Sequence, residues 1–161
     1  MVFYVGIDPG STGAMAILGP CGADTIDFTD PSFFDRLNDR EGQVHCMVEK
    51  VHAMPKQGVT SVFTFGTAYG KALGMLIALK VPYTLVTPQK WQKVFGISGR
   101  KGCTKKQSLE RARALFPGLA ASHLARVKDH NRADALLIAE YCRREMSQFE
   151  QKEEIDLSFM S

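Results

Sequence analysis

The stretch YVGIDPGSTGAMAI, residues 4–17, decides how the fold of this chain is interpreted. A run of apolar and β-branched residues ends on one aspartate, Asp8, and a glycine-rich turn leads into a second apolar run. This pattern predicts a buried strand followed by an antiparallel one. A carboxylate that ends a buried strand is costly unless a partner balances its charge. Asp8 is therefore a turn aspartate, a phosphate-site aspartate of a sugar-kinase-like fold, or a metal ligand.

Length and composition predict a single globular domain. The chain has 161 residues, of which 45% are apolar and 23% charged, and these values suit one core of ordinary size. We expect the domain at residues 1–148 and a polar, flexible tail at residues 149–161. Neither a membrane span nor a signal or transit peptide is evident, so we expect a cytoplasmic protein. The four cysteines lack CxxC spacing and are expected to be reduced thiols.

Basic residues gather in the middle of the chain, although the net charge is only +3. No Asp or Glu lies between Glu49 and Glu110. Such a stretch predicts a surface for a polyanion, with a solvated face that happens to lack acids as the alternative. The stretch holds ten basic residues: Lys50, Lys56, Lys71, Lys80, Lys90, Lys93, Arg100, Lys101, Lys105 and Lys106.

The order of predicted elements indicates an α/β protein. Strands are expected at residues 2–7, 14–19, 23–28, 43–49 and 83–87. Helices are expected at residues 30–40, 61–79, 88–96, 104–116 and 129–146. Asp30 and Thr104 are the expected caps of two of these helices, and Pro31 is an expected first helical residue. A meander of strands followed by alternating helices and strands predicts a mixed central sheet flanked by helices.

Three glycines spaced by four residues mark the helix expected at 61–79. They are Gly66, Gly70 and Gly74, and such a ridge lets another backbone approach closely. The ridge favours a helix-packing face, including a face for self-association, over a nucleotide loop. Neither a GxGxxG pattern nor a P-loop is present there.

Acidic residues end two of the predicted strands and enter the last helix. Asp8 ends the first strand and Glu49 the fourth, so the two emerge side by side if these strands are neighbours. Asp134 falls on the apolar side of the last helix, with Asp129 and His130 at its entry. Adjacent carboxylates repel unless a cation lies between them, and hard oxygens suit Mg²⁺ or Mn²⁺. Two such ions could activate a water and stabilise the leaving oxygen of a phosphodiester.

Each acidic residue also has an ordinary structural interpretation. Asp8 precedes Pro and Gly and could be only a turn residue. Glu49 could be a solvated strand end, and Asp129 or His130 an ordinary helix cap. Together with the acid-free basic stretch between them, the residues favour the metal site.

Four segments resemble the RuvC-like Holliday junction resolvases, most closely their phage and organellar branch. The resemblance covers residues 2–145 and implies an RNase H-like fold. It further implies a homodimer that nicks paired strands of a four-way DNA junction with Mg²⁺, which Mn²⁺ could replace. Such a crossover junction endodeoxyribonuclease leaves 5′-phosphate and 3′-hydroxyl ends, and would act in a bacterial or phage-infected cell. The segments are GIDPGSTGAMAI (6–17), MVEKVHAMPKQGVTSVFTFG (47–66), TPQKWQKVFG (87–96) and KDHNRADALLIAEY (128–141).

The resemblance implies roles for individual residues. By position, Asp8, Glu49 and Asp134 match the acidic ligands of two metal ions. The fourth ligand of such enzymes precedes the last aspartate by three to five residues and is an acid or a histidine. Here Asp129 and His130 compete for it. The family's junction wedge, often an aromatic residue shortly after the glutamate, has no obvious counterpart, because His52 stands there.

Helical geometry and ligand chemistry point to different fourth ligands. His130 lies four residues before Asp134, about 40° away around a helix axis, so both share one face. Asp129 could reach the same ions only from a non-helical cap position, but the hardness of Mg²⁺ favours its carboxylate. We predict Asp129 as the ligand, with His130 beside the metal or the attacking water.

Other function classes fit the sequence less well. An actin-like ATPase needs a second phosphate loop and a far longer chain, and an intact acidic set argues against a junction-binding protein that does not cleave. A related nuclease acting on other branched DNA or on RNA–DNA hybrids stays open. Phosphate contacts would position the DNA without reading its sequence. The predicted DNA-binding residues are Lys50, His52, Lys56, Lys90, Lys93, Arg100, Lys101, Lys105 and Lys106.

Overall fold

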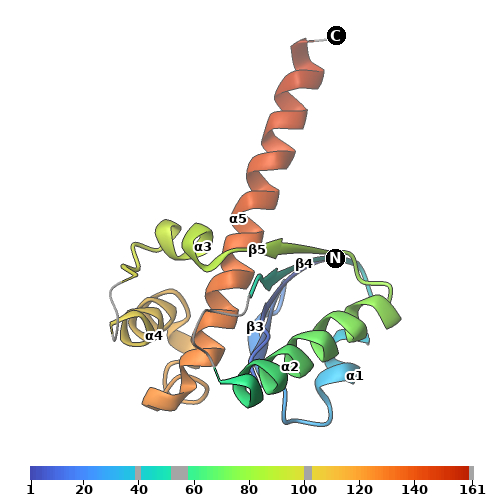
Figure 1. The fold of residues 1–161 in the computed structure, drawn as a ribbon. Coiled ribbons are helices and arrows are strands. Elements are labelled where there is room, and N and C mark those ends of the chain that lie inside the picture. Colours follow the sequence, from blue (N-terminus) through green and yellow to red (C-terminus); the bar gives the residue numbers. More distant parts are fainter. Residues whose placement is uncertain (39–40, 52–57, 100–102, 160–161) are drawn as a thin grey trace.

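The computed structural model describes residues 1–38, 41–51, 58–99 and 103–159. Within these residues the centre of the molecule is a five-stranded sheet in the order β3-β2-β1-β4-β5 (Figure 1). The first three strands pair antiparallel, whereas β4 runs parallel to both β1 and β5. The strands are β1 (Val2–Asp8), β2 (Ala14–Gly19), β3 (Gly22–Asp27), β4 (Gln43–Glu49) and β5 (Tyr83–Val86). The predicted mixed sheet is confirmed.

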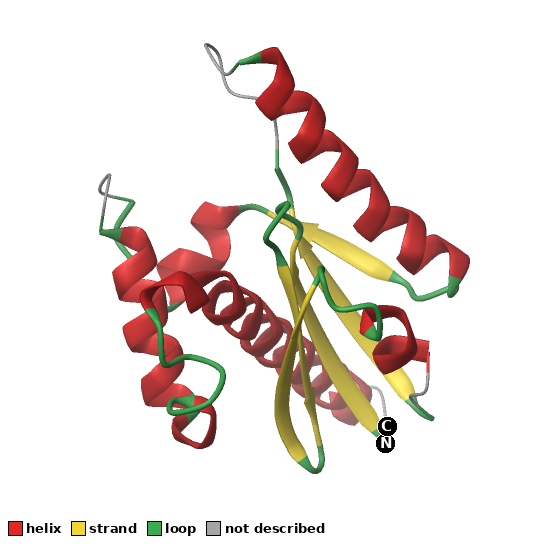
Figure 2. Ribbon diagram, turned by 90° about the horizontal axis from the view of Figure 1, so that it is seen from below, coloured by secondary structure: helices red, strands yellow, loops and turns green. Residues whose placement is uncertain are grey.

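Helices cover both faces of this sheet (Figure 2). On one face α5 packs in a core with residues of α3 and α4, and on the other α2 packs in a second core with a residue of α1. Within the described part of the chain, none of the helices has the length and apolar character needed to cross a membrane. The helices are α1 (Phe33–Asn38), α2 (Val59–Ala78), α3 (Pro88–Val94), α4 (Thr104–Leu115) and α5 (His130–Phe159), with 3₁₀ turns η1 (Pro117–Leu119) and η2 (Val127–Asp129).

Helix α5 packs directly on β1 because Gly6 has no side chain. A Cβ atom at Gly6 would lie 2.2 Å from the carbonyl oxygen of Ala135 and 2.3 Å from the nitrogen of Ala139. The other face of β1 carries Val5 and Ile7, which are fully buried toward α2. The close approach brings the first turns of α5 against β1 near its carboxyl end, where Asp8 lies.

The β1–β4 pairing confirms that the first and fourth strands are neighbours. Ile7 is paired with Val48 in a parallel register. Asp8 and Glu49 directly follow these partners, so both emerge at the same edge of the sheet.

Two helix starts and one boundary differ from the predictions. Helix α1 begins at Phe33 rather than Pro31, because Asp30 Oδ1 accepts hydrogen bonds from the backbone N and the hydroxyl of Ser32, forming a local turn. Helix α4 begins at Thr104 with Cys103 as its N-cap, so Thr104 is not the cap. Helix α5 runs through the predicted boundary at residue 148 and projects from the body (Figure 1). The flexibility of residues 149–161 stays a prediction.

Candidate active site

Three carboxylates from three elements influence one another at the carboxyl edge of the sheet. Burial, then the negative charges of Asp134 and Glu49, raise the pKa of Asp8 well above its ordinary value. Burial is also the largest cause that raises the pKa of Asp134 to about 7, and the charge of Glu49 adds to it. Mutual repulsion of this kind requires the groups to be close in space. The structure therefore brings together the three residues that the sequence predicts as metal ligands.

Glu49 is anchored by a residue outside the predicted set. The indole Nε1 of Trp91, on α3, donates a hydrogen bond of 2.9 Å to Glu49 Oε2. Burial raises the pKa of Glu49, and this hydrogen bond opposes that rise. Trp91 is fully buried. Its segment, TPQKW, carries the family resemblance, but no pattern in the sequence links it to Glu49.

Helix α4 contributes two further side chains to the site. The positive charge of Lys105 lowers the pKa of both Asp8 and Asp134. Ser108 lies close enough to Asp134 to lower its pKa, although the pair does not have hydrogen-bond geometry. Ser108 Oγ and Asp134 Oδ1 are both buried without a hydrogen bond to any described residue. Ser108 shares the apolar face of α4 with Leu109 and Ala112. A serine on an apolar helix face is the sequence signal that could have identified this residue.

The chemistry of the donor set fits a divalent cation. A hard cation would relieve the repulsion between the buried carboxylates. It would also give a partner to the Asp134 oxygen that lacks a hydrogen-bond donor. Among the described residues, no three His, Cys, Asp or Glu side chains are arranged to hold a metal ion by themselves. Mg²⁺ commonly binds through one or two carboxylates and completes its shell with water and substrate phosphate. Asp8, Glu49 and Asp134 suit this open kind of site.

Asp129 is engaged in an ion pair. Its Oδ1 accepts a 2.9 Å hydrogen bond from Arg126 Nη2, and its Oδ2 accepts one of 2.8 Å from the backbone N of Arg126. Burial alone would raise the pKa of Asp129, but the hydrogen bonds from Arg126 lower it. Asp129 ends η2 and closes a capping box there. A metal-ligand role for Asp129 would require its carboxylate to leave Arg126.

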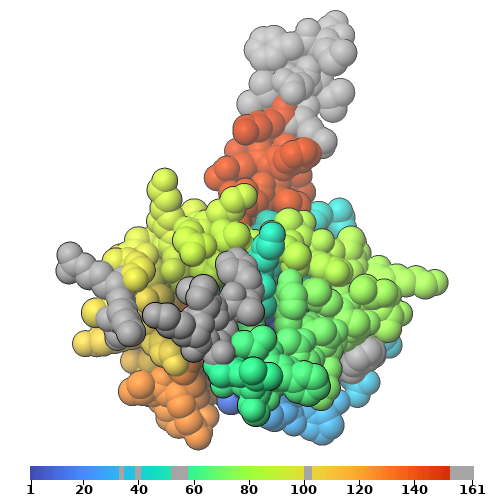
Figure 3. Space-filling view, viewed as in Figure 1, coloured from blue at the N-terminus to red at the C-terminus, as the bar shows by residue number. Residues whose placement is uncertain are grey.

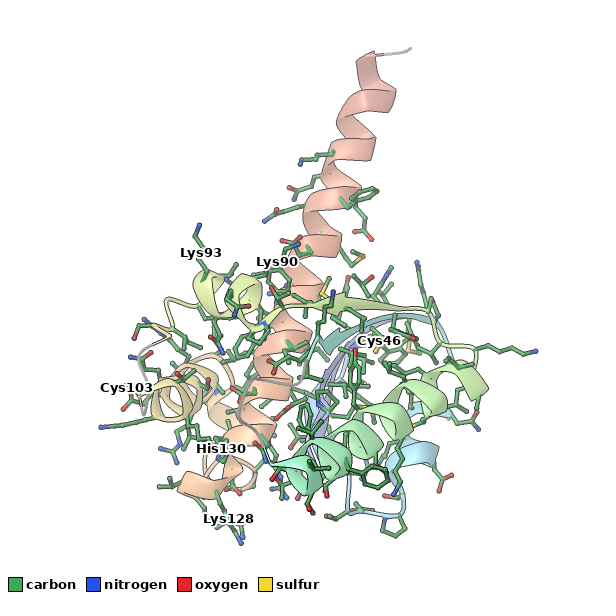
Figure 4. The ribbon with its side chains drawn as sticks, in the orientation of Figure 1. Cys46, Lys90, Lys93, Cys103, Lys128 and His130 are labelled. Carbon is green, nitrogen blue, oxygen red and sulfur yellow. The ribbon has the colours of Figure 1, made fainter. Side chains whose placement is uncertain are left out.

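His130 occupies the first helical position of α5. Its Nδ1 lies 3.3 Å from the carbonyl oxygen of Val127. Because it precedes Asp134 by four residues of one helix, both lie on the same face. Figure 4 shows His130 at this first turn, with Lys128 pointing away from the sheet below it.

Five of the predicted DNA-binding residues lie in described segments, and all five are exposed. Lys50 follows Glu49 directly, and Lys93 points outward from α3 (Figure 4). On the face of the molecule that Figure 3 shows, α3 and α4 lie to one side and α2 to the other. His52, Lys56, Arg100 and Lys101 lie outside the described residues. The five are Lys50, Lys90, Lys93, Lys105 and Lys106.

Comparison with curated proteins gives a relative over part of the chain. No family model matches the chain. The protein named Holliday junction resolvase MOC1, chloroplastic, of Chlamydomonas reinhardtii is 38% identical over 92 residues, which are 57% of this chain and 10% of that protein. This chain therefore aligns with about a tenth of the length of that relative.

A solved structure shows the fold. The structure of T. thermophilus RuvC in complex with a Holliday junction substrate superposes with a TM-score of 0.52 and 17% identity, over 85% of this chain and 90% of that one. A second structure of Thermus thermophilus RuvC gives a TM-score of 0.45 and 20% identity over the same shares. The chain has the RNase H-like fold, and the resemblance to RuvC-like Holliday junction resolvases predicted from its four motifs is confirmed.

Proposed function

We propose that this chain is a metal-dependent, structure-selective DNA endonuclease that resolves four-way junctions by paired symmetric nicks. The observation that carries the proposal is the meeting of Asp8, Glu49 and Asp134 at one sheet edge. Burial raises the pKa values of all three carboxyls, and repulsion raises those of Asp8 and Asp134 further. The similarity over 92 residues to a protein named as a Holliday junction resolvase supports the same class of reaction.

The three carboxylates would hold two Mg²⁺ ions, which Mn²⁺ could replace. Bound ions of this kind supply an activated water and stabilise the leaving oxygen of a phosphodiester. Lys105 would limit the repulsion between the carboxylates and an incoming phosphate, because its charge already acts on Asp8 and Asp134. The exposed lysines of α3 and α4 would hold the DNA backbones. Either Asp129 or His130 would complete the ligand set.

Paired nicks call for a homodimer, and α2 offers a surface for it. Val59, Phe63 and Ile77 are 87%, 76% and 65% exposed on this helix. At Gly66, Gly70 and Gly74, an added Cβ would meet nothing within 4 Å. By helical geometry, these six residues lie on one stripe. We propose that a second copy of this chain covers the stripe, related by a twofold axis that places two active sites on one junction.

The place of action is part of the same proposal. A bacterial or phage-infected cell is the location that the resemblance implies, and the relative is described as chloroplastic. The cytoplasm of such a cell and the interior of an organelle both hold DNA that recombines. We propose the cytoplasm, with the organelle as the alternative.

A panel of labelled substrates tests the proposed activity. The protein is incubated with Mg²⁺ and four-way, three-way, flap, RNA–DNA hybrid and linear substrates of matched sequence. We expect paired nicks in opposite strands of the four-way junction. Preferred cleavage of the hybrid or flap would assign a different RNase H-like nuclease, and binding without cleavage would assign a junction-binding protein.

Asp8→Asn is the variant that tests the site within this panel. It should abolish cleavage while junction binding persists or tightens, because a negative charge that repels phosphate is lost. Asp35→Asn is the matched control, since Asp35 is exposed on α1. An Asp8→Asn protein that still cleaves in Mg²⁺ would overturn the assignment.

A further inference from the structure

Trp91 is the only tryptophan in the chain, and its one polar atom is bonded to a carboxylate of the proposed site. We propose that Trp91 is the positioning residue for Glu49: the indole N–H fixes Oε2, so that Oε1 is the oxygen presented to a divalent cation. The inference rests on the proposed function, because it requires Glu49 to be a metal ligand.

The pairing of β4 with β5 brings Trp91 close to Glu49. Glu49 is paired with Val86, the last residue of β5, and the backbone N of Lys50 donates a 2.7 Å hydrogen bond to the Val86 carbonyl. The chain then enters α3 at once, with Thr87 as N-cap and Pro88 as first helical residue. Trp91 follows one helical turn after Thr87. The short connection TPQKW therefore places an indole beside the end of β4.

Packing holds the indole rigidly. Trp91 is 0% exposed and belongs to the core cluster that includes Phe95, Ile97 and residues of α5. A buried indole N–H requires an acceptor, and the acceptor here is Glu49 Oε2 at 2.9 Å. A ring that is fixed on all sides can fix the carboxylate that it contacts.

One engaged oxygen suits the coordination of Mg²⁺. This ion demands near-ideal octahedral geometry and uses few carboxylates, whereas Ca²⁺ readily accepts both oxygens of one carboxylate. Hydrogen-bond partners that orient metal ligands typically change metal affinity or activity by about 10- to 100-fold when they are replaced. The same range is expected for the loss of the Trp91 N–H.

Trp91→Phe removes the N–H and keeps an aromatic ring. We expect the Mg²⁺ concentration for half-maximal junction cleavage to rise about tenfold or more, with a smaller loss of rate at saturating Mg²⁺. Binding of Mn²⁺ to the DNA-free protein, measured by electron paramagnetic resonance, should weaken by a similar factor. Phe95→Leu is the matched control, because Phe95 is buried in the same cluster and its side chain has no hydrogen-bond donor. This control should lower the melting temperature without changing the metal affinity.

The indole N–H itself gives a second readout in the wild-type protein. With one tryptophan in the chain, the ¹⁵N-labelled protein has one indole N–H resonance. Saturation with Mg²⁺ should shift this resonance, and Glu49→Gln should abolish the shift. An unmoved resonance during metal binding that depends on Glu49 would overturn the inference, as would unchanged Mn²⁺ affinity in Trp91→Phe. If Glu49→Gln itself leaves Mn²⁺ binding and cleavage unchanged, the proposed metal site fails, and the inference fails with it.

Discussion

The protonation of Asp134 links the stability of the protein to pH. Its pKa is raised to about 7 in the fold, chiefly by burial, against about 3.9 for an unperturbed aspartate. The folded chain therefore holds the proton more tightly than the unfolded chain. The stabilisation from this residue is present at low pH and is lost as pH rises from about 4 through about 7. The pKa values of Asp8 and Glu49 are raised in the same direction.

The metal-free protein should accordingly lose stability between about pH 4 and about pH 7. One pKa unit corresponds to about 1.4 kcal/mol, so Asp134 alone accounts for at most roughly 4 kcal/mol of free energy of unfolding across its window. Thermal melting in a chelator at several pH values measures the slope. Asp134→Asn should flatten it and raise the melting temperature at pH 8, and Mg²⁺ should restore stability to the wild type there. A wild-type slope that Asp134→Asn leaves intact would contradict the raised pKa.

Asp129 and His130 compete for the fourth ligand position, and the prediction made from the sequence remains Asp129. Asp129→Asn should then cripple cleavage in Mg²⁺, and His130→Ala should reduce it less. Because Asp129 also caps η2 through Arg126, the rates must be compared well below the melting temperature of each variant. Cleavage of one junction at fixed pH and metal concentration ranks the variants. The reverse ranking would give the ligand role to His130 and leave Asp129 a capping residue.

Among the elements, α4 carries two adjacent lysines for which we expect different roles, one beside the carboxylates and one in binding DNA. Lys105 acts on Asp8 and Asp134 through its charge, whereas Lys106 lies 3.9 Å from Glu110 on the exposed surface. Lys105→Gln should lower the cleavage rate and move its pH dependence upward, because a charge that lowers both carboxyl pKa values is lost. Lys106→Gln should mainly weaken junction binding.

The salt dependence of junction binding distinguishes these two roles. Each lost phosphate contact should lower the slope of log affinity against log salt by roughly 0.9. Lys106→Gln should show this change with an unaltered pH profile of cleavage. Equal effects of both substitutions on the pH profile would show that the charge of Lys105 has no special place beside the carboxylates. Unchanged binding and slope in a variant that carries both Lys105→Gln and Lys106→Gln would place the DNA surface elsewhere.

Local sequence signals predict the strands and the strand ends. They do not predict contacts between residues far apart in the sequence. Strand β4 occupies the predicted residues 43–49 because its apolar run is bounded by Gly42 and Lys50, and the site at Asp8 and Glu49 follows from strand ends. The start of α1 is missed because a side-chain hydrogen bond from Ser32 to Asp30 decides it. The Trp91–Glu49 bond joins residues 42 apart and has no local pattern.

At the scale of the whole molecule, one copy of this chain holds one proposed site, and the proposed paired nicks need two. The α2 stripe is exposed and apolar, with glycines that leave room for a second helix backbone. We therefore expect a dimer by light scattering at tens of micromolar, twice the 17.8 kDa of one chain. Gly70→Leu should yield a folded monomer, because a side chain there fills open space in one copy and blocks the approach of another. Gly118→Leu, also in open space, is the matched control.

The monomeric variant also separates nicking from resolution. On a supercoiled plasmid that extrudes a cruciform, two coupled nicks in one binding event linearise the circle, whereas independent nicks leave a relaxed nicked circle. Wild type and Gly118→Leu should release linear plasmid, and Gly70→Leu should accumulate nicked circles at concentrations where it stays monomeric. Each nick by Gly70→Leu would still need Asp8, because the proposed metal ligands all come from one chain. Linear product released directly by a monomeric Gly70→Leu protein would refute the twofold arrangement, and an unchanged dimer in that variant would move the interface away from α2.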